Sequence, residues 1–310
     1  MKLAISIGDL NGIGLEIALR AHNEIKTLCQ PIYCIDESML TWGAAMLGLE
    51  IPEDFKTYGC GEPFDITPGI PTAFSGSYAY DSFITALDLT KKKTADAMVT
   101  LPINKEAWAL ANVPYKGHTD ALSAILQEDA TMMLGCDKLF TALFTHHIPL
   151  KDVPKKIKKK TLKNFLVNFY NDVKEPYIGV LGLNPHAGDG GVIGKEDKRI
   201  AKAIKKANQA LESEIFIGPL VPDTAFTKRN LEKMHYFVCM YHDQGLAPLK
   251  ALFFEESINV SLGLSIIRTS VDHGTAYDIA YKNKAPSTLS YYNAVKEAVR
   301  LIEKHQIFTL

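Results

Sequence analysis

The sequence contains few cysteines, and none of them forms a Cys-x-x-Cys pair. Only five cysteines occur among the 310 residues. An odd, unpaired set argues against a disulfide framework and against a four-cysteine zinc site. We therefore expect reduced thiols and a cytoplasmic protein.

Long apolar runs and an excess of one charge are also lacking. No run reaches the roughly 18 apolar residues of a membrane span, and Asp9 interrupts the N-terminal apolar segment too early for a signal peptide. Lys plus Arg (34) balance Asp plus Glu (35), so that the net charge is −1. This balance predicts no general attraction to nucleic acid or to membranes. The lysine-rich stretch 151–163 lacks interleaved aromatic residues, and we interpret it as a solvated helix start that joins two lobes.

What is present is a pattern of short apolar runs that alternate with longer amphipathic stretches. Runs typical of buried strands occur at 3–7, 32–35, 97–101, 140–144, 177–183, 215–217 and 236–240. Helical periodicity occurs at 15–22, 82–89, 162–169, 197–211 and 291–302. This alternation predicts an α/β fold with largely parallel sheets. We expect one catalytic unit, residues 1–310, of two interlocked α/β lobes with a crossover near 130–150.

The first candidate motif is the glycine-rich turn at 8–14, which follows the first predicted strand. Asp36 comes 22 positions after Gly14, a spacing that invites a dinucleotide-binding interpretation. The glycines, however, follow GxxxGxG instead of the required GxGxxG. A structural turn near the active site is the favoured interpretation.

A second group of polar residues follows the predicted strand 97–101. In Gly117-His118-Thr119-Asp120, Thr119 is placed to cap a helix that starts at Asp120. Alternatively, a helix N-terminus beside His118 and Lys105 forms an anion site. The spacing alone leaves both interpretations open.

Histidines follow three of the predicted strands: His147, His186 and His242. A single histidine is more often structural, but the ends of parallel strands lie at one edge of a sheet. Three imidazoles that meet there would suit a Lewis-acid metal site.

A fourth group contains Lys250, Asn259 and Arg268. Lysine and arginine both suit phosphate or carboxylate. The following turn, Asp272 to Ala276, has a glycine that permits close approach of a ligand, although a simple loop or helix cap would explain it equally well.

Together these motifs resemble those of one family, the 4-hydroxythreonine-4-phosphate dehydrogenases of vitamin B6 biosynthesis. The resemblance covers roughly residues 5–280. It rests on the ordered motifs GDLNGIGLE, PINK, GHTD, THHIPL, NPHAGDGG, GPLVPDTAF, YHDQGLAPLK and RTSVDHGTAYDIA.

The resemblance implies a fold similar to isocitrate and isopropylmalate dehydrogenases, with two α/β/α lobes flanking a cleft and no conventional Rossmann domain. It implies oxidation of 4-phosphooxy-L-threonine by NAD or NADP, then decarboxylation to 3-amino-2-oxopropyl phosphate. It also implies a homodimer with the active site at the subunit interface, and one divalent ion (zinc, magnesium or cobalt) per site.

The resemblance also assigns roles to residues. The metal ligands fall on His147, His186 and His242, with His146 as the alternative to His147. Substrate binding falls on His118, Thr119, Lys250, Asn259 and Arg268, and cofactor binding falls on His273, Gly274, Thr275 and Ala276. Leu10 and Asn11 replace the family's usual proline and alanine.

A proton acceptor is still required, and Asp243 and Asp223 are the candidates. Either carboxylate could instead hold a metal-bound imidazole in its tautomer. The alternatives to this activity are a related dehydrogenase for another phosphorylated hydroxy acid, a metal-dependent hydrolase, and a protein that only binds metal or anions.

Overall fold

The computed structural model describes residues 1–307 and divides into two compact units. Of the described residues, unit 1 comprises 1–130 and 258–307, and unit 2 comprises 131–257. The chain therefore leaves unit 1 after Ala130 and returns to it at Ile258. The lysine-rich stretch 151–163 lies wholly inside unit 2, so our expectation that it joins two lobes is wrong.

Unit 1 is built on six strands in the order β3-β2-β1-β4-β11-β10. All neighbours are parallel except β10 and β11. The strands are β1 (Lys2–Ser6), β2 (Gln30–Cys34), β3 (Thr57–Tyr58), β4 (Ala97–Thr100), β10 (Ile258–Leu262) and β11 (Arg268–Val271). The first four follow a doubly wound order, but the next position belongs to β11, and β10 runs antiparallel. Unit 1 is therefore not a conventional dinucleotide-binding domain.

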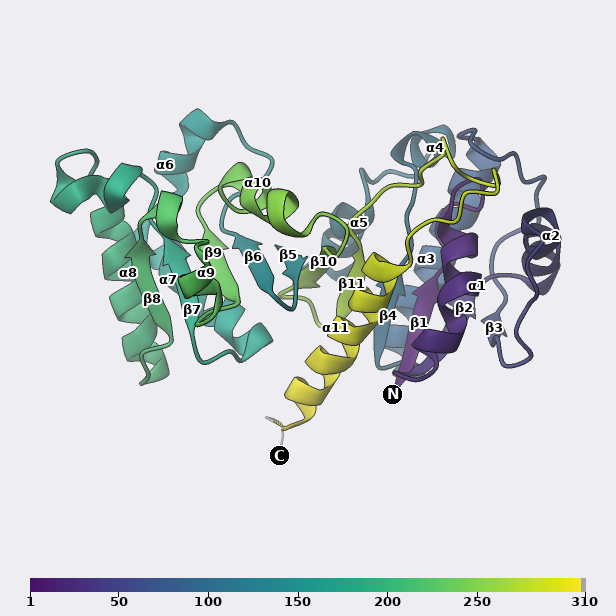
Figure 1. Ribbon diagram of the computed structural model, residues 1–310, viewed down its shortest axis with the longest axis horizontal. Coiled ribbons are helices and arrows are strands. Elements are labelled where there is room, and N and C mark those ends of the chain that lie inside the picture. Colours follow the sequence, from purple (N-terminus) through teal and green to yellow (C-terminus); the bar gives the residue numbers. More distant parts are fainter. Residues whose placement is uncertain (308–310) are drawn as a thin grey trace. The chain divides into compact units, whose positions relative to one another are not determined.

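Helices cover both faces of the unit 1 sheet. Figure 1 shows α1 and α11 on the near face and α3 behind the strands. The helices are α1 (Gly14–Ile25), α2 (Glu37–Leu47), α3 (Ala73–Lys91), α4 (Lys105–Leu110), α5 (His118–Leu126) and α11 (Leu289–Ile307). Because side chains alternate along a strand, Ala4 and Met98 pack with Phe83 in a core that also contains Trp108.

Unit 2 has five strands in the order β5-β6-β9-β7-β8. The β5–β6 pair is antiparallel and the other neighbours are parallel. The strands are β5 (Thr131–Cys136), β6 (Leu139–Leu143), β7 (Ile178–Leu181), β8 (Phe216–Leu220) and β9 (Tyr236–Cys239). The helices are α6 (Val153–Lys156), α7 (Lys159–Val173), α8 (Glu196–Leu211), α9 (Lys228–Leu231) and α10 (His242–Phe253), with short 3₁₀ turns η1 (Leu150–Asp152), η2 (Pro185–Gly191) and η3 (Pro222–Thr224).

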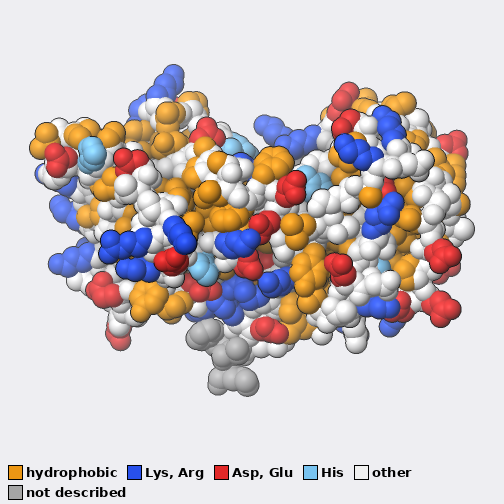
Figure 2. Space-filling model, viewed as in Figure 1, with side chains coloured by type: hydrophobic (Ala, Val, Ile, Leu, Met, Phe, Trp, Pro, Cys, Tyr) orange, Lys and Arg blue, Asp and Glu red, His pale blue; other side chains and the backbone are white. Residues whose placement is uncertain are grey.

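The core of unit 2 beneath α10 is apolar and buried. Leu246 and Leu249 of α10 pack with Phe237 and Cys239 of β9 and with Leu143 of β6. This packing holds the first turn of α10 close to the ends of the central strands. Charged side chains of both signs are interspersed over the visible surface (Figure 2).

The predicted α/β class is confirmed, and the seven predicted strands correspond to β1, β2, β4, β6, β7, β8 and β9. The five predicted helices lie within α1, α3, α7, α8 and α11. The short strand β3 and the strands β5, β10 and β11 have no counterpart among our expectations. No helix among residues 1–307 is long and apolar enough to cross a membrane.

Candidate active site

Three histidine-bearing segments of unit 2 begin at the ends of neighbouring parallel strands. His147 follows β6, His242 follows β9 and His186 follows β7, and these strands are adjacent in the sheet. Two hydrogen bonds connect their ends. The hydroxyl of Thr145 donates to the carbonyl of Met240 (2.6 Å), and the amide of Gln244 donates to the carbonyl of Gly182 (2.7 Å). The three segments therefore leave one edge of the sheet, as expected for parallel strands.

The structure brings two of the three predicted imidazoles together. The rings of His147 and His242 are 5.5 Å apart between centroids, and His146 lies 5.2 Å from His147. His186 is exposed on its own loop. Among the described residues, the only group of three with ligand atoms within 4.8 Å of one another is Cys136, Asp137 and Glu256. His186 therefore has to approach the other two imidazoles for all three to share one ion.

Asp243 is placed to orient His242. Its Oδ1 lies 2.7 Å from Nδ1 of His242, although its side chain is 82% exposed. A carboxylate at Nδ1 favours the tautomer with the proton on that nitrogen. The lone pair of Nε2 is then free to bind a metal ion. This donor chemistry fits a divalent ion such as zinc or cobalt. Asp223, the other candidate acid, lies exposed in η3 after β8.

His146 occupies a different environment from its neighbour. Its Nδ1 is buried without a hydrogen-bond partner among the described residues. Burial lowers the pKa of His146, and the nearby imidazoles of His147 and His242 lower it further. His146 is therefore held neutral beside the candidate ligands, and neutral imidazole is the form that binds a metal.

Left-handed backbone carries two of the candidate ligands. His147 has a φ of 40°, and His186 (53°), Ala187 (52°) and Asp189 (42°) lie in one left-handed turn. Each such residue other than glycine costs about 1–2 kcal/mol. Asp197 stabilises the turn, because its carboxylate accepts hydrogen bonds from the Leu183 N–H (2.7 Å) and from the Asn184 amide (2.7 Å). Strain that the surroundings maintain in this way is typical of functional sites.

Unit 1 contains a second candidate cluster, centred on a buried arginine. Arg268, the first residue of β11, is 2% exposed. Its Nη2 donates to the hydroxyl of Thr100 (2.7 Å) and lies 3.2 Å from Nδ1 of His118, and its Nη1 donates to the hydroxyl of Ser261 (3.1 Å). Burial lowers the pKa of Arg268 to about 9. A buried guanidinium with neutral partners is suited to an anionic ligand.

The imidazole of His118 also packs against two aromatic rings. Its ring centroid is 5.2 Å from Phe83 and 5.5 Å from Trp108. Burial lowers the pKa of His118 well below 6.5, and the charge of Arg268 lowers it further. The imidazole is therefore neutral at physiological pH.

Thr119 does not cap the helix that contains it. Helix α5 begins at His118, Gly117 occupies the N-cap position, and no side chain caps the helix. The capping hypothesis was wrong because the helix begins two residues earlier than the sequence pattern indicated. His118 and Thr119 therefore lie in the first turn, where N–H groups have no helical partner.

The other predicted substrate residues lie in different surroundings. In unit 2, Nζ of Lys250 on α10 lies 3.2 Å from the hydroxyl of Ser257 and 5.1 Å from the ring centroid of Phe254. In unit 1, Oδ1 of Asn259 on β10 is buried and has no hydrogen-bond partner among residues 1–307. Asn259 is thus an open acceptor.

The predicted cofactor turn, 273–276, packs directly against the glycine-rich turn. The Ile13 N–H donates to the carbonyl of Thr275 (3.1 Å). A Cβ on Gly12 would lie 2.8 Å from that residue, so only glycine fits. In the turn itself, Nδ1 of His273 lies 3.0 Å from the carbonyl of Gly274, while its Nε2 is buried without a partner in the described chain.

The glycine-rich turn has a structural role, as expected. Asp9 is fully buried and accepts a hydrogen bond from the hydroxyl of Tyr277 (2.7 Å), and burial raises its pKa. The Asn11 amide donates to the carbonyl of Ile70 (2.8 Å). Asp36 caps α2 by accepting from the Ser38 N–H (2.8 Å). This role as a helix cap accounts for the carboxylate of Asp36 without a bound nucleotide.

Residues that the sequence interpretation missed are Thr100, Ser261 and Asp197. They occur in no recognisable motif, because their contacts join segments that are distant along the chain. Only Thr100 had a signal, as a polar residue inside an otherwise apolar predicted strand.

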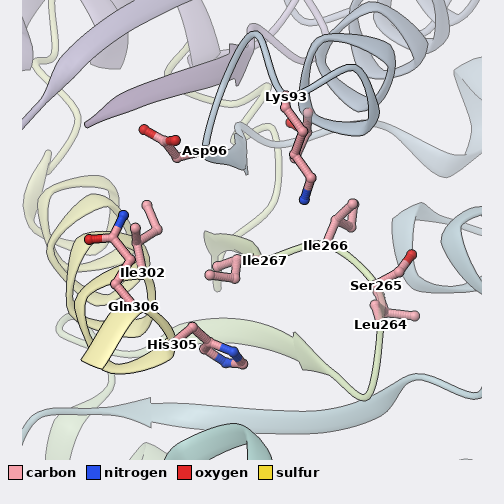
Figure 3. Close-up of a pocket in the computed structure, with 10 residues that line it drawn as sticks. Lys93, Asp96, Leu264, Ser265, Ile266, Ile267, Ile302, His305 and Gln306 are labelled. Atoms are coloured by element: carbon pink, nitrogen blue, oxygen red, sulfur yellow. The ribbon is translucent and has the colours of Figure 1, made fainter. Parts of the chain in front are cut away.

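A cavity of about 660 Å³ lies elsewhere in unit 1. His305, near the end of α11, borders it on one side, and Lys93 lies on the opposite side (Figure 3). None of the predicted site residues lines it. The candidate site is therefore defined by the two side-chain clusters and not by this cavity.

Comparison with known proteins identifies the family. The family described as pyridoxal phosphate biosynthetic protein PdxA matches residues 27–298. The chain is 58% identical to a 4-hydroxythreonine-4-phosphate dehydrogenase from Sulfurimonas denitrificans over 98% of this chain and 99% of the relative. It is 56% identical to the enzyme of that name from Campylobacter fetus, over 97% and 98% of the two chains.

A solved structure agrees with this match. The crystal structure of a 4-hydroxythreonine-4-phosphate dehydrogenase from Burkholderia phymatum superposes with a TM-score of 0.81 and 31% identity, over 97% of this chain and 98% of that one. The resemblance seen in the motifs is thus confirmed over nearly the whole length. The chain belongs to the PdxA family of pyridoxal phosphate biosynthetic proteins.

Proposed function

We propose that the chain oxidises 4-phosphooxy-L-threonine with NAD and that the resulting keto acid loses carbon dioxide to form 3-amino-2-oxopropyl phosphate. The observation that carries this proposal is the 58% identity to a 4-hydroxythreonine-4-phosphate dehydrogenase over 98% of the chain. The side-chain chemistry of each unit supports specific roles within this reaction.

The phosphate group of the substrate binds to Arg268, with His118 and Thr119 as further donors. Arg268 is buried and has no carboxylate partner among the described residues, so that an anion would compensate its charge. Lys250 supplies a further positive charge and Asn259 an acceptor for other polar groups of the substrate. Binding of these groups, which do not react, holds the reacting carbon in position for hydride transfer.

A divalent ion is held by His147, His186 and His242. When bound, such an ion supplies Lewis acidity toward the substrate oxygen. Asp243 orients His242 through the contact at Nδ1. Because Asp243 is engaged in this way, Asp223 is the stronger candidate for the acceptor of the hydroxyl proton.

The cofactor binds at the turn His273, Gly274, Thr275 and Ala276. Gly274 has no atom within 4 Å of the position that a Cβ would occupy, so the backbone there is open to a ligand. NAD is the proposed cofactor, with NADP as the alternative. The active form is a cytoplasmic homodimer whose active site lies at the subunit interface.

The direct test is a spectrophotometric assay of NAD reduction by the purified protein with 4-phosphooxy-L-threonine, after chelation and after addition of Zn²⁺, Co²⁺ or Mg²⁺. We expect turnover that depends on the ion. Release of inorganic phosphate without NAD reduction would instead indicate a hydrolase, and turnover only with another phosphorylated hydroxy acid would change the substrate.

Matched histidine variants test the ligand set. His147→Ala and His186→Ala should abolish ion binding measured by calorimetry, whereas His146→Ala should retain it because His146 packs beside the ligands. If His146→Ala loses ion binding and His147→Ala retains it, the ligand is His146 and not His147. Light scattering after size exclusion tests the dimer.

A further inference from the structure

The buried guanidinium of Arg268 is held by neutral groups alone. Its three hydrogen-bonding neighbours are the hydroxyls of Thr100 and Ser261 and the imidazole of His118. No carboxylate pairs with it within residues 1–307. Burial of an unpaired charge is strongly unfavourable. This arrangement therefore lowers the stability of the protein without a bound ligand.

Geometry explains why Thr100 holds the guanidinium. Arg268 pairs with Met98 across the parallel β11–β4 ladder, and Thr100 pairs with Ser270 two residues further along. Side chains two apart share a face of the sheet, so the arginine side chain extends along β4 to the Thr100 hydroxyl. That contact, at 2.7 Å, is the shortest of the three, and Thr100 is fully buried.

The same contacts determine the tautomer of His118. Arginine N–H groups only donate, so Nδ1 of His118, 3.2 Å from Nη2, accepts. The Thr100 hydroxyl, which accepts from Arg268, lies 3.4 Å from the same nitrogen. The proton of the neutral imidazole is therefore on Nε2, which is buried and has no partner in the described chain. Nε of Arg268 is a second buried donor without a described partner.

We propose that Thr100 and Ser261 are positioning residues that hold Arg268 and His118 for the phosphate group of the substrate without neutralising the arginine. A carboxylate at either position would pair with the guanidinium and repel the dianion. Neutral hydroxyls fix the guanidinium plane and leave its charge for the ligand. This inference rests on the proposed function of Arg268 and adds residues that touch no substrate atom.

Thr100→Val tests the proposal, because it removes the hydroxyl and keeps the shape. Thr269→Val is the matched control: Thr269 is the next residue after Arg268, is fully buried, and donates to the carbonyl of Ala294 (2.8 Å) on the other face of the sheet. Both variants lose one buried hydroxyl, but only Thr100 contacts the arginine.

We expect Thr100→Val to raise KM for 4-phosphooxy-L-threonine about tenfold with a smaller change in kcat, as for loss of one hydrogen bond to a charged group. Thr100→Ser should restore KM to within about threefold. Ser261→Ala should raise KM less, because its contact is longer. Equal KM values for Thr100→Val and Thr269→Val would overturn the proposal.

A spectroscopic measurement separates this proposal from the proposed function. Proton–nitrogen correlation spectra of ¹⁵N-histidine-labelled protein should show His118 protonated at Nε2 only, at neutral pH. A proton at Nδ1, or a charged imidazolium, would overturn the proposed arrangement even if the enzyme turns over. If the wild type does not oxidise the substrate, the proposed function fails. Titration with inorganic phosphate then tests the positioning role by itself: weaker phosphate binding by Thr100→Val but not by Thr269→Val supports it, and equal binding by the two variants overturns it.

Discussion

Replacement of Ala187 by glycine should make the protein more stable, in contrast to most alanine-to-glycine changes. Ala187 has a φ of 52° within the left-handed turn that carries His186. An L-residue there costs about 1–2 kcal/mol, which glycine avoids. Glycine loses about 0.5–1 kcal/mol more through its larger conformational freedom in the unfolded chain. The difference between these two ranges is about 0–1.5 kcal/mol, so we expect the free energy of unfolding to rise by about 0.7 kcal/mol.

The control is Ala201→Gly. Ala201 is exposed in the middle of α8, where the backbone is helical, and glycine there should lower stability by about 1 kcal/mol. Urea denaturation followed by circular dichroism measures both variants. If Ala187→Gly destabilises the protein as much as Ala201→Gly does, the backbone strain that we assign to this turn is absent.

The same variant should also affect the proposed ion site. A more flexible turn positions His186 less well, so binding of Zn²⁺ to Ala187→Gly should weaken several-fold while stability rises. Calorimetric titration of the chelated protein measures this affinity. Stability and affinity that rise together would contradict the idea that the strained turn serves the site.

Three further predictions concern other parts of both units. Asp36→Ala should cost about 1 kcal/mol of stability through loss of the α2 cap and leave KM for NAD unchanged; a large rise in that KM would restore a role in cofactor binding. His118→Gln should reduce the loss of stability on acidification: the pKa of His118 is lowered below 6.5 by folding, so the wild type should lose about 1 kcal/mol more than the variant between pH 6.5 and 5.5 in urea titrations. An equal loss in both proteins would contradict the buried neutral imidazole. Asp243→Asn should weaken ion binding about 10–100-fold in calorimetric titrations, because the carboxylate at Nδ1 of His242 is lost; unchanged affinity would remove Asp243 from this role.

The sequence alone was sufficient to predict the α/β class, most of the strands and the family. Buried parallel strands are continuous apolar runs, and the family motifs are local strings that need no knowledge of contacts. The placement of His147, His186 and His242 after three separate strands was also visible, since each histidine comes two or three positions after an apolar run.

Only the tertiary structure revealed the contacts between distant segments. The return of the chain at Ile258 places β11 beside β4, and this pairing alone brings Arg268 to Thr100. The left-handed turn at His186 depends on Asp197, and the start of α5 at His118 was not evident from the pattern around Thr119. Such features arise because a hydrogen bond or a burial depends on which strands become neighbours, and a local pattern of residues does not contain that information.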